Sequence, residues 1–284
     1  MYWTKRREKF RGLIEGNRCV NPGSVYDAVS AHIAAHVGYE VMVLAGSIAS
    51  MAVLGAPDVV VMTLSDLAGL THRINRAGQL PLLVDADHGF GNALNVRRTI
   101  EELETAGAAA ITIEDTILPK PFGSETMAFI SLEEGIAKMK AALDARQDPK
   151  LSIIARTNVA GVFGIDEAVR RAQAYEKTGV DGLFFTGITQ RSDLEKLSNE
   201  TTLPLSLVHS GNLTDLNELA KLHVRIRLQP HLPFMAAMQA TYETMTALNE
   251  GTAPSDINFG SSEDLQDTLL DGAAYKNWTK QFLS

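Results

Sequence analysis

Cysteine is nearly absent from this sequence: Cys19 is the single one among 284 residues. One cysteine cannot form a disulfide within the chain, and it cannot build a zinc site from several thiolates. A chain of this size without disulfides is typical of a reducing compartment, so we expect a cytoplasmic protein.

Long apolar runs are also missing. The longest stretch without a charged residue, Val41–Pro57, is shorter than the roughly 20 apolar residues of a transmembrane helix and is interrupted by glycine and serine. We predict a buried strand followed by a loop for this stretch. The N-terminal segment, Met1–Arg11, is strongly charged and does not resemble a secretory signal. We therefore expect no membrane partner.

Positive charge is scarce relative to negative charge. Lys and Arg total 26 against 34 Asp and Glu, which gives a formal net charge of −8. Binding to the phosphates of nucleic acid needs a positive surface, so we expect no nucleic-acid partner. Apolar residues make up 45% of the chain, which is enough for a sizeable core and excludes disorder as the main description.

Short aliphatic runs alternate with longer segments of helical periodicity. The runs are apolar on both faces, as expected for parallel strands that helices cover. The candidate strands are Arg18–Val20, Val41–Ala45, Leu80–Val84, Ala110–Ile113, Leu151–Ala155, Gly182–Phe185, Pro204–Val208 and Val224–Leu228. The candidate helices are Val25–His36, Leu64–Arg76, Ala93–Thr105, Leu132–Ala145, Ile165–Lys177, Ser192–Ser198, Leu213–Leu222 and Pro233–Asn249.

Eight strand–helix units favour a (β/α)8 barrel of the TIM type over the alternative, a doubly wound open sheet. We expect one barrel domain over residues 1–284, with a helical extension at residues 252–284. A linker, Gly251–Gly260, precedes a last amphipathic segment, Ser262–Leu283. This segment has no strand after it and could cap the barrel or reach a neighbouring subunit.

Polar residues follow the predicted strands at the end of the barrel where active sites lie. They are Gly46, Ser47, Asp85, Asp87, His88, Glu114, Asp115, Arg156, Thr157, Asn158, His209 and His231. Asp85 and Asp87 are two positions apart, and Glu114 ends the following strand. Carboxylates this close repel one another unless a cation lies among them, and their oxygens suit Mg²⁺ or Mn²⁺. We therefore expect Asp85, Asp87 and Glu114 to form a metal site.

Two competing motifs are weak. Gly89-Phe90-Gly91 follows a strand as a dinucleotide-binding loop would, but Leu94 stands where such a loop has its third glycine. His32 and His36 have the spacing of zinc ligands on a helix, but the glutamate of a metalloprotease motif is missing between them, so we interpret them as a structural pair.

Several motifs, taken in order, resemble the isocitrate lyase / phosphoenolpyruvate mutase superfamily from Ser24 to about Gly251. They are Gly46-Ser47, Ala56-Pro57-Asp58, Asp85-Ala86-Asp87-His88-Gly89-Phe90-Gly91-Asn92, Ile113-Glu114-Asp115 and Ala155-Arg156-Thr157-Asn158. The resemblance implies an α/β barrel with Mg²⁺ (or Mn²⁺) near Asp85, Asp87 and Glu114. It further implies a 2-oxo acid bound through the metal, the Gly46-Ser47 backbone and Arg156, with Asp58 and His231 also in the substrate site. Family members exchange the helix after the barrel between subunits, which implies a homotetramer built as a dimer of helix-swapped dimers.

One departure from the family pattern narrows the expected activity. Carbon–carbon lyases of the family carry a Lys-x-Cys-Gly loop whose cysteine is the general acid, whereas this chain has Pro119-Lys120-Pro121-Phe122-Gly123. Phe122 cannot donate a proton, and the asparagine-bearing loop of the mutase is missing as well. What remains is most similar to the branch that decarboxylates oxaloacetate, in which His88 and His231 have counterparts. The resemblance therefore implies a carboxy-lyase.

Decarboxylation of a β-keto acid leaves an enolate, so the site mainly needs a sink for electrons. Mg²⁺ chelated by the C2 oxygen and the C1 carboxylate would act as a Lewis acid. Arg156 would stabilise the developing oxyanion, His231 would orient the substrate, and Ser47 would help to hold the C1 carboxylate.

Three alternatives stay open. They are a carbon–carbon lyase of the methylisocitrate lyase type, a C–P bond hydrolase acting on a related 2-oxo acid, and a barrel that binds metal and carboxylate without turnover. The acidic residues and Arg156 argue against the last, because an unused site has no reason to keep carboxylates that repel one another.

Overall fold

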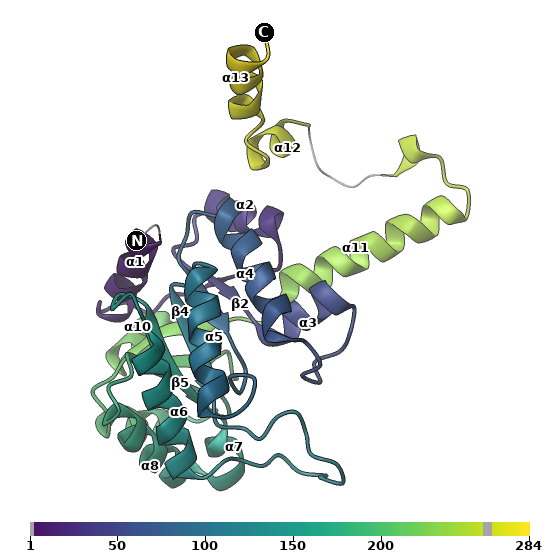
Figure 1. Ribbon diagram of the computed structural model, residues 1–284. Helices are drawn as coiled ribbons and strands as arrows, with labels where there is room; N and C mark the ends of the chain where they lie inside the picture. Colours follow the sequence, from purple (N-terminus) through teal and green to yellow (C-terminus); the bar gives the residue numbers. More distant parts are fainter. Residues whose placement is uncertain (1–2, 258–262) are drawn as a thin grey trace.

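Eight parallel strands form the centre of the protein, whose computed structural model describes residues 3–257 and 263–284 (Figure 1). The strands are β1 Gly23–Ser24, β2 Met42–Leu44, β3 Leu82–Asp85, β4 Ala110–Glu114, β5 Ser152–Thr157, β6 Gly182–Phe185, β7 Leu205–Val208 and β8 Val224–Leu228. They pair in sequence order. A parallel bridge between Val20 and Ile226 joins β8 to the segment before β1, which closes the sheet into a barrel. The predicted (β/α)8 fold is confirmed.

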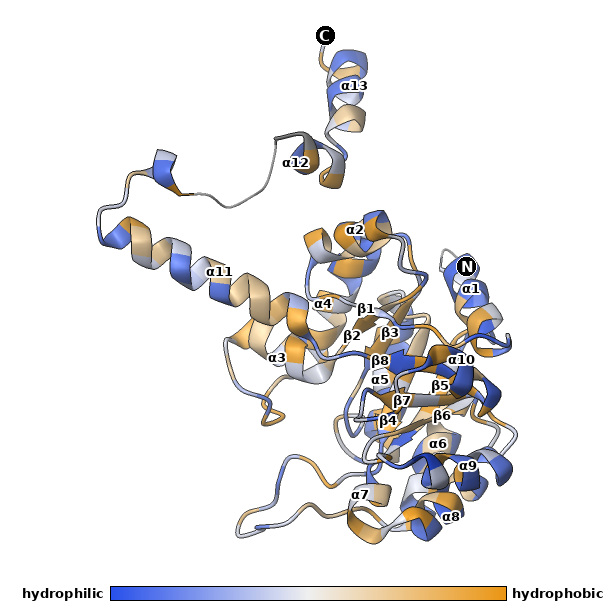
Figure 2. Ribbon diagram, turned by 180° about the vertical axis from the view of Figure 1, so that it is seen from behind, coloured by the Kyte–Doolittle hydropathy of each residue, from blue (hydrophilic) through white to orange (hydrophobic). Residues whose placement is uncertain are grey.

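Helices follow the strands and cover the barrel (Figures 1 and 2). They are α1 Thr4–Ile14, α2 Ala28–Val37, α3 Gly46–Leu54, α4 Leu64–Ala77, α5 Ala93–Thr105, α6 Leu132–Ala145, α7 Val159–Phe163, α8 Ile165–Glu176, α9 Arg191–Asn199, α10 Leu216–Lys221, α11 Leu232–Asn249, α12 Glu263–Leu269 and α13 Gly272–Phe282, with a 3-10 turn at Pro254–Asp256. Side-chain caps fix where several of them begin. Asp27, Thr63 and Asn92 each form a capping box with the residue three positions on.

The core has two layers, because strand residues point alternately into the barrel and toward the helices. The larger layer lies between the strands and the surrounding helices. The smaller one fills the barrel and includes Val43, Leu83 and Ile154. Phe10 and Ile14 of α1 belong to this inner layer, so α1 closes the barrel at the amino ends of the strands.

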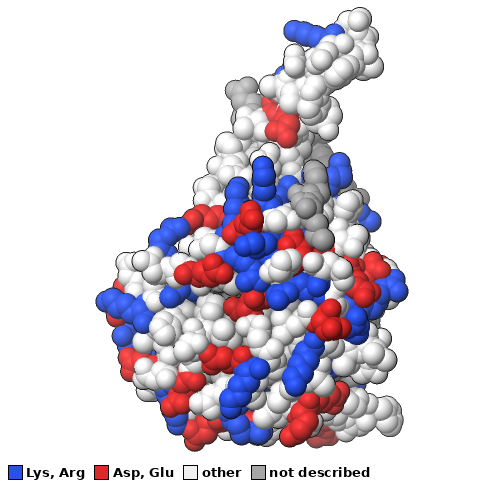
Figure 3. Space-filling model, turned by 60° about the vertical axis from the view of Figure 1, so that its left-hand side comes forward, with Lys and Arg blue, Asp and Glu red and all other residues white. Residues whose placement is uncertain are grey.

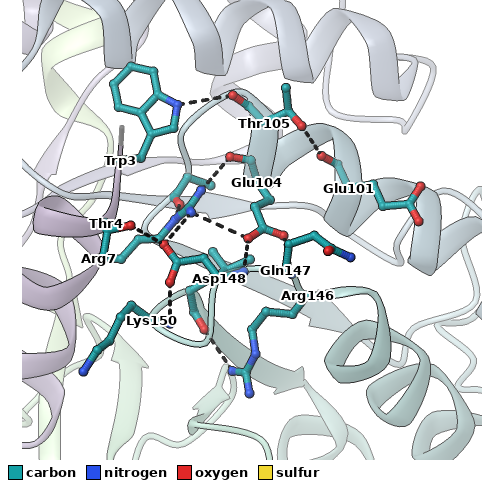
Figure 4. Close-up of polar contacts among 12 residues, drawn as sticks. Trp3, Thr4, Arg7, Glu101, Glu104, Thr105, Arg146, Gln147, Asp148 and Lys150 are labelled. Atoms are coloured by element: carbon teal, nitrogen blue, oxygen red, sulfur yellow. Dashed lines mark hydrogen bonds and ion pairs between the residues drawn. The ribbon is translucent and has the colours of Figure 1, made fainter. Parts of the chain in front are cut away.

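A buried arginine fastens α1 to that end of the barrel (Figure 4). Arg7, 1% exposed, donates to Asp148 Oδ2 at 2.9 Å and to the carbonyl oxygens of Ala108 and Glu104 at 3.0 and 2.6 Å. The Glu104 carboxylate accepts from the backbone amides of Gln147 and Asp148 at 2.9 and 2.6 Å. Every charge of this cluster therefore has a partner, as buried charges require.

Two local predictions were wrong. The first strand is Gly23–Ser24 rather than Arg18–Val20, although Val20 makes the bridge that closes the barrel. The predicted loop after β2 is a helix, α3, which ends at Gly55 in a left-handed conformation with φ 61°. Its glycine and serines suggested a loop, but alanine, methionine and leucine favour a helix, and Gly55 supplies the C-terminal cap.

The C-terminal part begins with α11, which leads away from the barrel and has no buried residue (Figures 1 and 2). The predicted amphipathic segment is two helices, α12 and α13, because the chain turns at Asp271 with φ 54°. The end of the predicted linker and Ser262 lie outside the described residues. One domain over 1–284 with an extension at 252–284 stays a prediction.

Two features concern binding to nucleic acid or to a membrane: the distribution of surface charge and the apolar character of the helices. On the face drawn in Figure 3, basic and acidic side chains intermingle, and neither sign covers a large area. In the part of the chain that the structure describes, no helix combines the length and the apolar character needed to cross a bilayer.

Candidate active site

A small cavity of about 110 Å³ lies at the carboxyl ends of the strands. Its lining combines an apolar floor with acidic, basic and hydroxyl groups: Val43, Ala45, Ser47, Asp58, Leu83, Asp85, Asp87, Thr112, Arg156, Phe184, Val208, Leu228 and His231. Asp85 is the last residue of β3 and Arg156 the last but one of β5, while Ser47 and His231 lie in the connections after β2 and β8. The fold therefore brings residues from distant parts of the sequence to one place.

Arg156 lies between two carboxylates. Its Nη1 donates to Asp85, and its Nε lies 3.1 Å from Glu114 Oε2. The other Asp85 oxygen accepts from Thr112 Oγ1 at 2.9 Å, and the guanidinium carbon is 5.3 Å from the centre of the Phe184 ring. Burial alone would raise the pKa of Asp85, but Arg156 and the hydrogen bonds from Thr112 and the Asp87 backbone together outweigh burial, so the pKa is lowered. Asp85 is therefore an ionised carboxylate at the cavity wall, held in place by Arg156 and Thr112.

Asp87 has the opposite electrostatics. Burial, together with repulsion from Asp85 and Glu114, raises the pKa of Asp87 to about 8. Burial is also the main reason that the pKa values of Glu114 and Asp58 are raised, with repulsion from Asp85 as a second cause. One arginine thus faces four carboxyl groups, so the cluster has fewer positive charges than acidic groups.

A divalent cation fits this imbalance. Carboxylate oxygens are the ligands that Mg²⁺ and Mn²⁺ prefer, and a dication would relieve the repulsion that raises the pKa of Asp87. Among residues 3–257 and 263–284, however, no three Asp, Glu, His or Cys side chains already converge as a ligand cluster, and Arg156 stands between Asp85 and Glu114. The donor set fits a metal, and its assignment to Asp85, Asp87 and Glu114 stays a prediction.

The turn after β3 places Asp87 in a strained backbone. Asp87 has φ 47° and Phe90 φ 60°, both in the left-handed region that residues other than glycine avoid. The carbonyl oxygen of Asp87 accepts from the Glu114 amide at 2.7 Å, which ties the turn to the end of β4. Gly46 leaves room for the Asp87 carboxylate, because a Cβ at position 46 would lie 2.5 Å from Asp87 Oδ1.

The N-terminus of α3 also faces this region. Its N-cap residue, Ala45, has no side chain that could accept from the first amides of the helix, and both Ala45 and Ser47 line the cavity. Free amides at a helix N-terminus are a binding site for a carboxylate or another anion. The α3 N-terminus and the Ser47 hydroxyl together can therefore hold a substrate carboxylate.

His231 reaches the cavity from the loop after β8. Its Nδ1 lies 2.7 Å from the Ser24 hydroxyl, at the end of β1. Burial lowers the pKa of His231, although Asp85 partly opposes this effect. A neutral imidazole that accepts at Nδ1 carries its proton on Nε2, which leaves Nε2 as a hydrogen-bond donor.

Most predicted site residues meet here. Ser47, Asp58, Asp85, Asp87, Arg156 and His231 line the cavity, and Gly46 packs against Asp87. Glu114 contacts Arg156 but does not line the cavity. His88 is buried and does not line it either. Phe122 is fully exposed on the loop between β4 and α6, which extends away from the barrel beside α7 (Figures 1 and 2).

Sequence reasoning missed three cavity or supporting residues. Ser24 and Thr112 carry no motif of their own and are found only once the barrel closes. Phe184 belongs to a predicted strand, but its sequence context does not indicate that its ring lies against Arg156. Pairing of β5 with β6 sets Arg156 opposite Phe184, and this register needs the structure.

Comparison with known proteins places the chain in a family. A model of the phosphoenolpyruvate phosphomutase family matches residues 10–249. The chain belongs to this family. Two curated relatives named oxaloacetate decarboxylase match almost end to end. The one from Bradyrhizobium sp. strain BTAi1 is 50% identical over 100% of this chain and 99% of its own length. The one from Bradyrhizobium diazoefficiens is 51% identical over 97% of this chain and 96% of its own.

A solved structure supports the same fold. Phosphonopyruvate hydrolase in complex with oxalate and Mg²⁺ is 26% identical to this chain, has a TM-score of 0.86, and is matched over 98% of this chain and 99% of its own.

Proposed function

We propose that this chain converts oxaloacetate to pyruvate and CO2 with the help of a divalent cation. One observation carries the proposal: a half-buried arginine, an excess of carboxylates and an uncapped helix N-terminus share a single small cavity. The choice of oxaloacetate rests on the full-length relatives that are about half identical and bear that activity in their names. The volume of the cavity suits a small substrate rather than a large ligand.

The protein's own groups would orient the substrate. The free amides of the α3 N-terminus and the Ser47 hydroxyl bind the C1 carboxylate, and His231 Nε2–H donates to a substrate oxygen. This arrangement leaves the C3–C4 bond free to break. The floor of the cavity is apolar and includes Val43, Leu83 and Leu228.

When C3–C4 breaks, CO2 departs and the bonding electron pair moves toward the C2 oxygen, which gives the enolate of pyruvate. Arg156 is fixed by Asp85 and Glu114 before the reaction begins, so it stabilises this negative charge without reorganising. Asp85, Asp87 and Glu114 would hold a divalent cation, which would supply Lewis-acid stabilisation of the developing negative charge. Solvent can then protonate C3, so the reaction does not need a general acid in the place of Phe122.

The test is product analysis on a panel of substrates. The purified chain is mixed with oxaloacetate, phosphonopyruvate or 2-methylisocitrate, each with Mg²⁺ or with EDTA. We expect pyruvate and CO2 from oxaloacetate faster than the metal alone produces them, and no release above the spontaneous rate in EDTA. Oxalate, a planar mimic of the enolate, should inhibit strongly.

Each alternative activity gives a different result in this panel. Phosphate from phosphonopyruvate would indicate a C–P hydrolase, and succinate from 2-methylisocitrate would indicate a carbon–carbon lyase. Oxalate binding without any turnover would indicate a silent barrel. Any of these results, with oxaloacetate left intact, would replace the proposal.

We also propose Mg²⁺ as the ion used, with Mn²⁺ able to replace it, a cytoplasmic location, and a homotetramer built as a dimer of helix-swapped dimers. Support for the assembly comes from α11, which exposes Met235, Met238, Tyr242 and Met245 away from the barrel. Light scattering on the purified chain should give four times the chain mass of 30.8 kDa, and a monomer would contradict it.

A further inference from the structure

Lys138 of α6 is a charged residue in an unusual place. Only 3% of its surface is exposed. Glu134, Asp115 and Glu114 attract its ammonium group, but none of the ion pairs found among the described residues includes Lys138. Within the part of the chain that the structure describes, its Nζ donates to the backbone carbonyl oxygen of His88 at 2.9 Å. Burying an ammonium is expensive, and a methionine of similar length would fill the space without that penalty.

That carbonyl belongs to the strained turn that follows β3. Within it, Asp87, Gly89, Phe90 and Gly91 have φ values of 47°, 79°, 60° and 145°. Two of them are not glycine, so the turn holds this shape only where its surroundings fix it. The turn is also what directs the Asp87 carboxylate into the cavity.

Successive carbonyl oxygens of the turn are each held by a donor from a different element. Asp87 O accepts from the Glu114 amide of β4 at 2.7 Å, and Gly89 O accepts from the Thr99 hydroxyl of α5 at 3.1 Å. His88 O, between them, accepts from Lys138 of α6. The first donor is backbone and the second a neutral hydroxyl, whereas the third is a charged group and makes the stronger kind of hydrogen bond.

We propose that Lys138 is a positioning residue, which fixes the turn at His88 and thereby holds the Asp87 carboxylate in the cavity for a divalent cation. It touches neither substrate nor cation. Its place in the reaction rests on the proposed function, but its effect on the turn and on metal binding does not.

The test compares Lys138→Met with Lys140→Met. Both remove one positive charge from α6, but Lys140 is exposed and does not contact the turn. Three quantities are measured: the melting temperature, hydrogen exchange of the backbone amides of residues 86–91 in metal-free protein, and the dissociation constant of Mn²⁺ by electron paramagnetic resonance.

For Lys138→Met we expect exchange in the turn to accelerate at least tenfold and Mn²⁺ affinity to fall by about 10–100-fold, the range found when an outer-shell partner is removed. Exchange in the central strands should stay as in the wild type, and Lys140→Met should match the wild type throughout. Unchanged Mn²⁺ affinity and turn exchange, with only a lower melting temperature, would overturn the proposal and leave Lys138 a packing residue.

A second variant covers the case in which Lys138→Met does not fold. Lys138→Ala leaves room for a small alkylammonium ion, so ethylammonium should restore Mn²⁺ affinity in a saturable manner. Tetramethylammonium, which has no N–H donor, should not. Equal effects of the two ions, or none from ethylammonium, would overturn the proposal. If the wild type binds Mn²⁺ but does not consume oxaloacetate, the proposed function fails while this result stands.

Discussion

Two arginine–carboxylate clusters lie at opposite ends of the barrel, one buried around Arg7 and one half-buried around Arg156. At the amino ends of the strands, Arg7 meets Glu104 and Asp148, and backbone amides and carbonyls satisfy the remaining groups. Burial alone would raise the pKa of Asp148, but Arg7 and other donors lower it below its usual value. At the carboxyl ends, Arg156 faces four carboxyl groups, and the pKa of Asp87 rises to about 8.

The difference separates a structural cluster from a functional one. The Arg7 cluster is complete, so its contribution is to fix α1 against the barrel. The Arg156 cluster has more carboxyl groups than positive charges, and it lines a cavity. A bound cation would balance this excess of negative charge. Substitutions at the two ends should therefore have opposite consequences for stability and activity.

Replacing Arg156 should have the largest effect on activity. We expect Arg156→Met to lower kcat by about 10²–10³-fold, the usual loss when a preorganised group that stabilises an oxyanion is removed. Steady-state rates of pyruvate release would measure this. An Arg156→Met variant with the wild-type kcat would show that Arg156 does not stabilise the transition state.

Replacing Arg7 should have the largest effect on stability. Arg7→Met leaves Glu104 and Asp148 buried without their cation, so the free energy of unfolding should fall by about 3–5 kcal/mol. Denaturant unfolding measures this loss. The folded fraction should keep the wild-type kcat. A loss of kcat without a loss of stability would show that the Arg7 cluster is not purely structural.

Gly46→Ala tests the close packing at the mouth. The new Cβ would lie 2.5 Å from Asp87 Oδ1, so the carboxylate must move, and we expect Mn²⁺ affinity to fall about tenfold or more. Gly69→Ala on α4 is the control, since the nearest atom to its Cβ is the end of Arg73 at 4.0 Å. Titration of both variants should show a loss only at Gly46.

Asp87 should make the metal-free protein sensitive to pH. Its pKa is about 8 in the folded chain against an ordinary value of 3.8, so between these values the folded state holds a proton that the unfolded state has released. Stability therefore falls as pH rises toward 8 and levels off above it. Denaturant midpoints in EDTA from pH 5 to 9 should show this slope, and Asp87→Asn should reduce it. Equal slopes in the two proteins would show that a group other than Asp87 causes the pH dependence.

Ser24→Ala should have the smallest effect. Loss of its hydrogen bond to His231 Nδ1 frees the imidazole to rotate or change tautomer, which corresponds to roughly 1 kcal/mol, or about fivefold in kcat/KM. Ser24→Thr keeps the hydroxyl and should recover most of the activity. An alanine variant with unchanged kcat/KM would show that His231 is held by other contacts.

Sequence patterns were enough for the barrel, because each unit repeats an aliphatic run and an amphipathic helix. They were not enough for α3, where Gly46 and Ser47 resemble loop residues but begin a helix. Asp85, Asp87, Glu114 and Arg156 could be assigned because each lies at or just after the carboxyl end of a strand. That Arg156 lies between Asp85 and Glu114 depends on strand register and side-chain rotamers, which no local pattern encodes.

The position of Lys138 in the sequence indicates that its charge is buried. It shares one face of α6 with Gly135, Met139 and Ala142, so a charged residue stands in an apolar stripe. Such a position predicts a buried charge with a specific partner. Finding that partner, the His88 carbonyl, requires the packing of α6 against the turn.

Cation-dependent decarboxylation at this cavity is best tested by comparing pyruvate release from oxaloacetate by the wild type and by Asp85→Ala, each with Mg²⁺ and with EDTA. We predict release by the wild type well above the rate with Mg²⁺ alone, abolished by EDTA, and a rate no faster than Mg²⁺ alone for the variant. Equal rates for the two proteins, or a wild-type rate that survives EDTA, would contradict it.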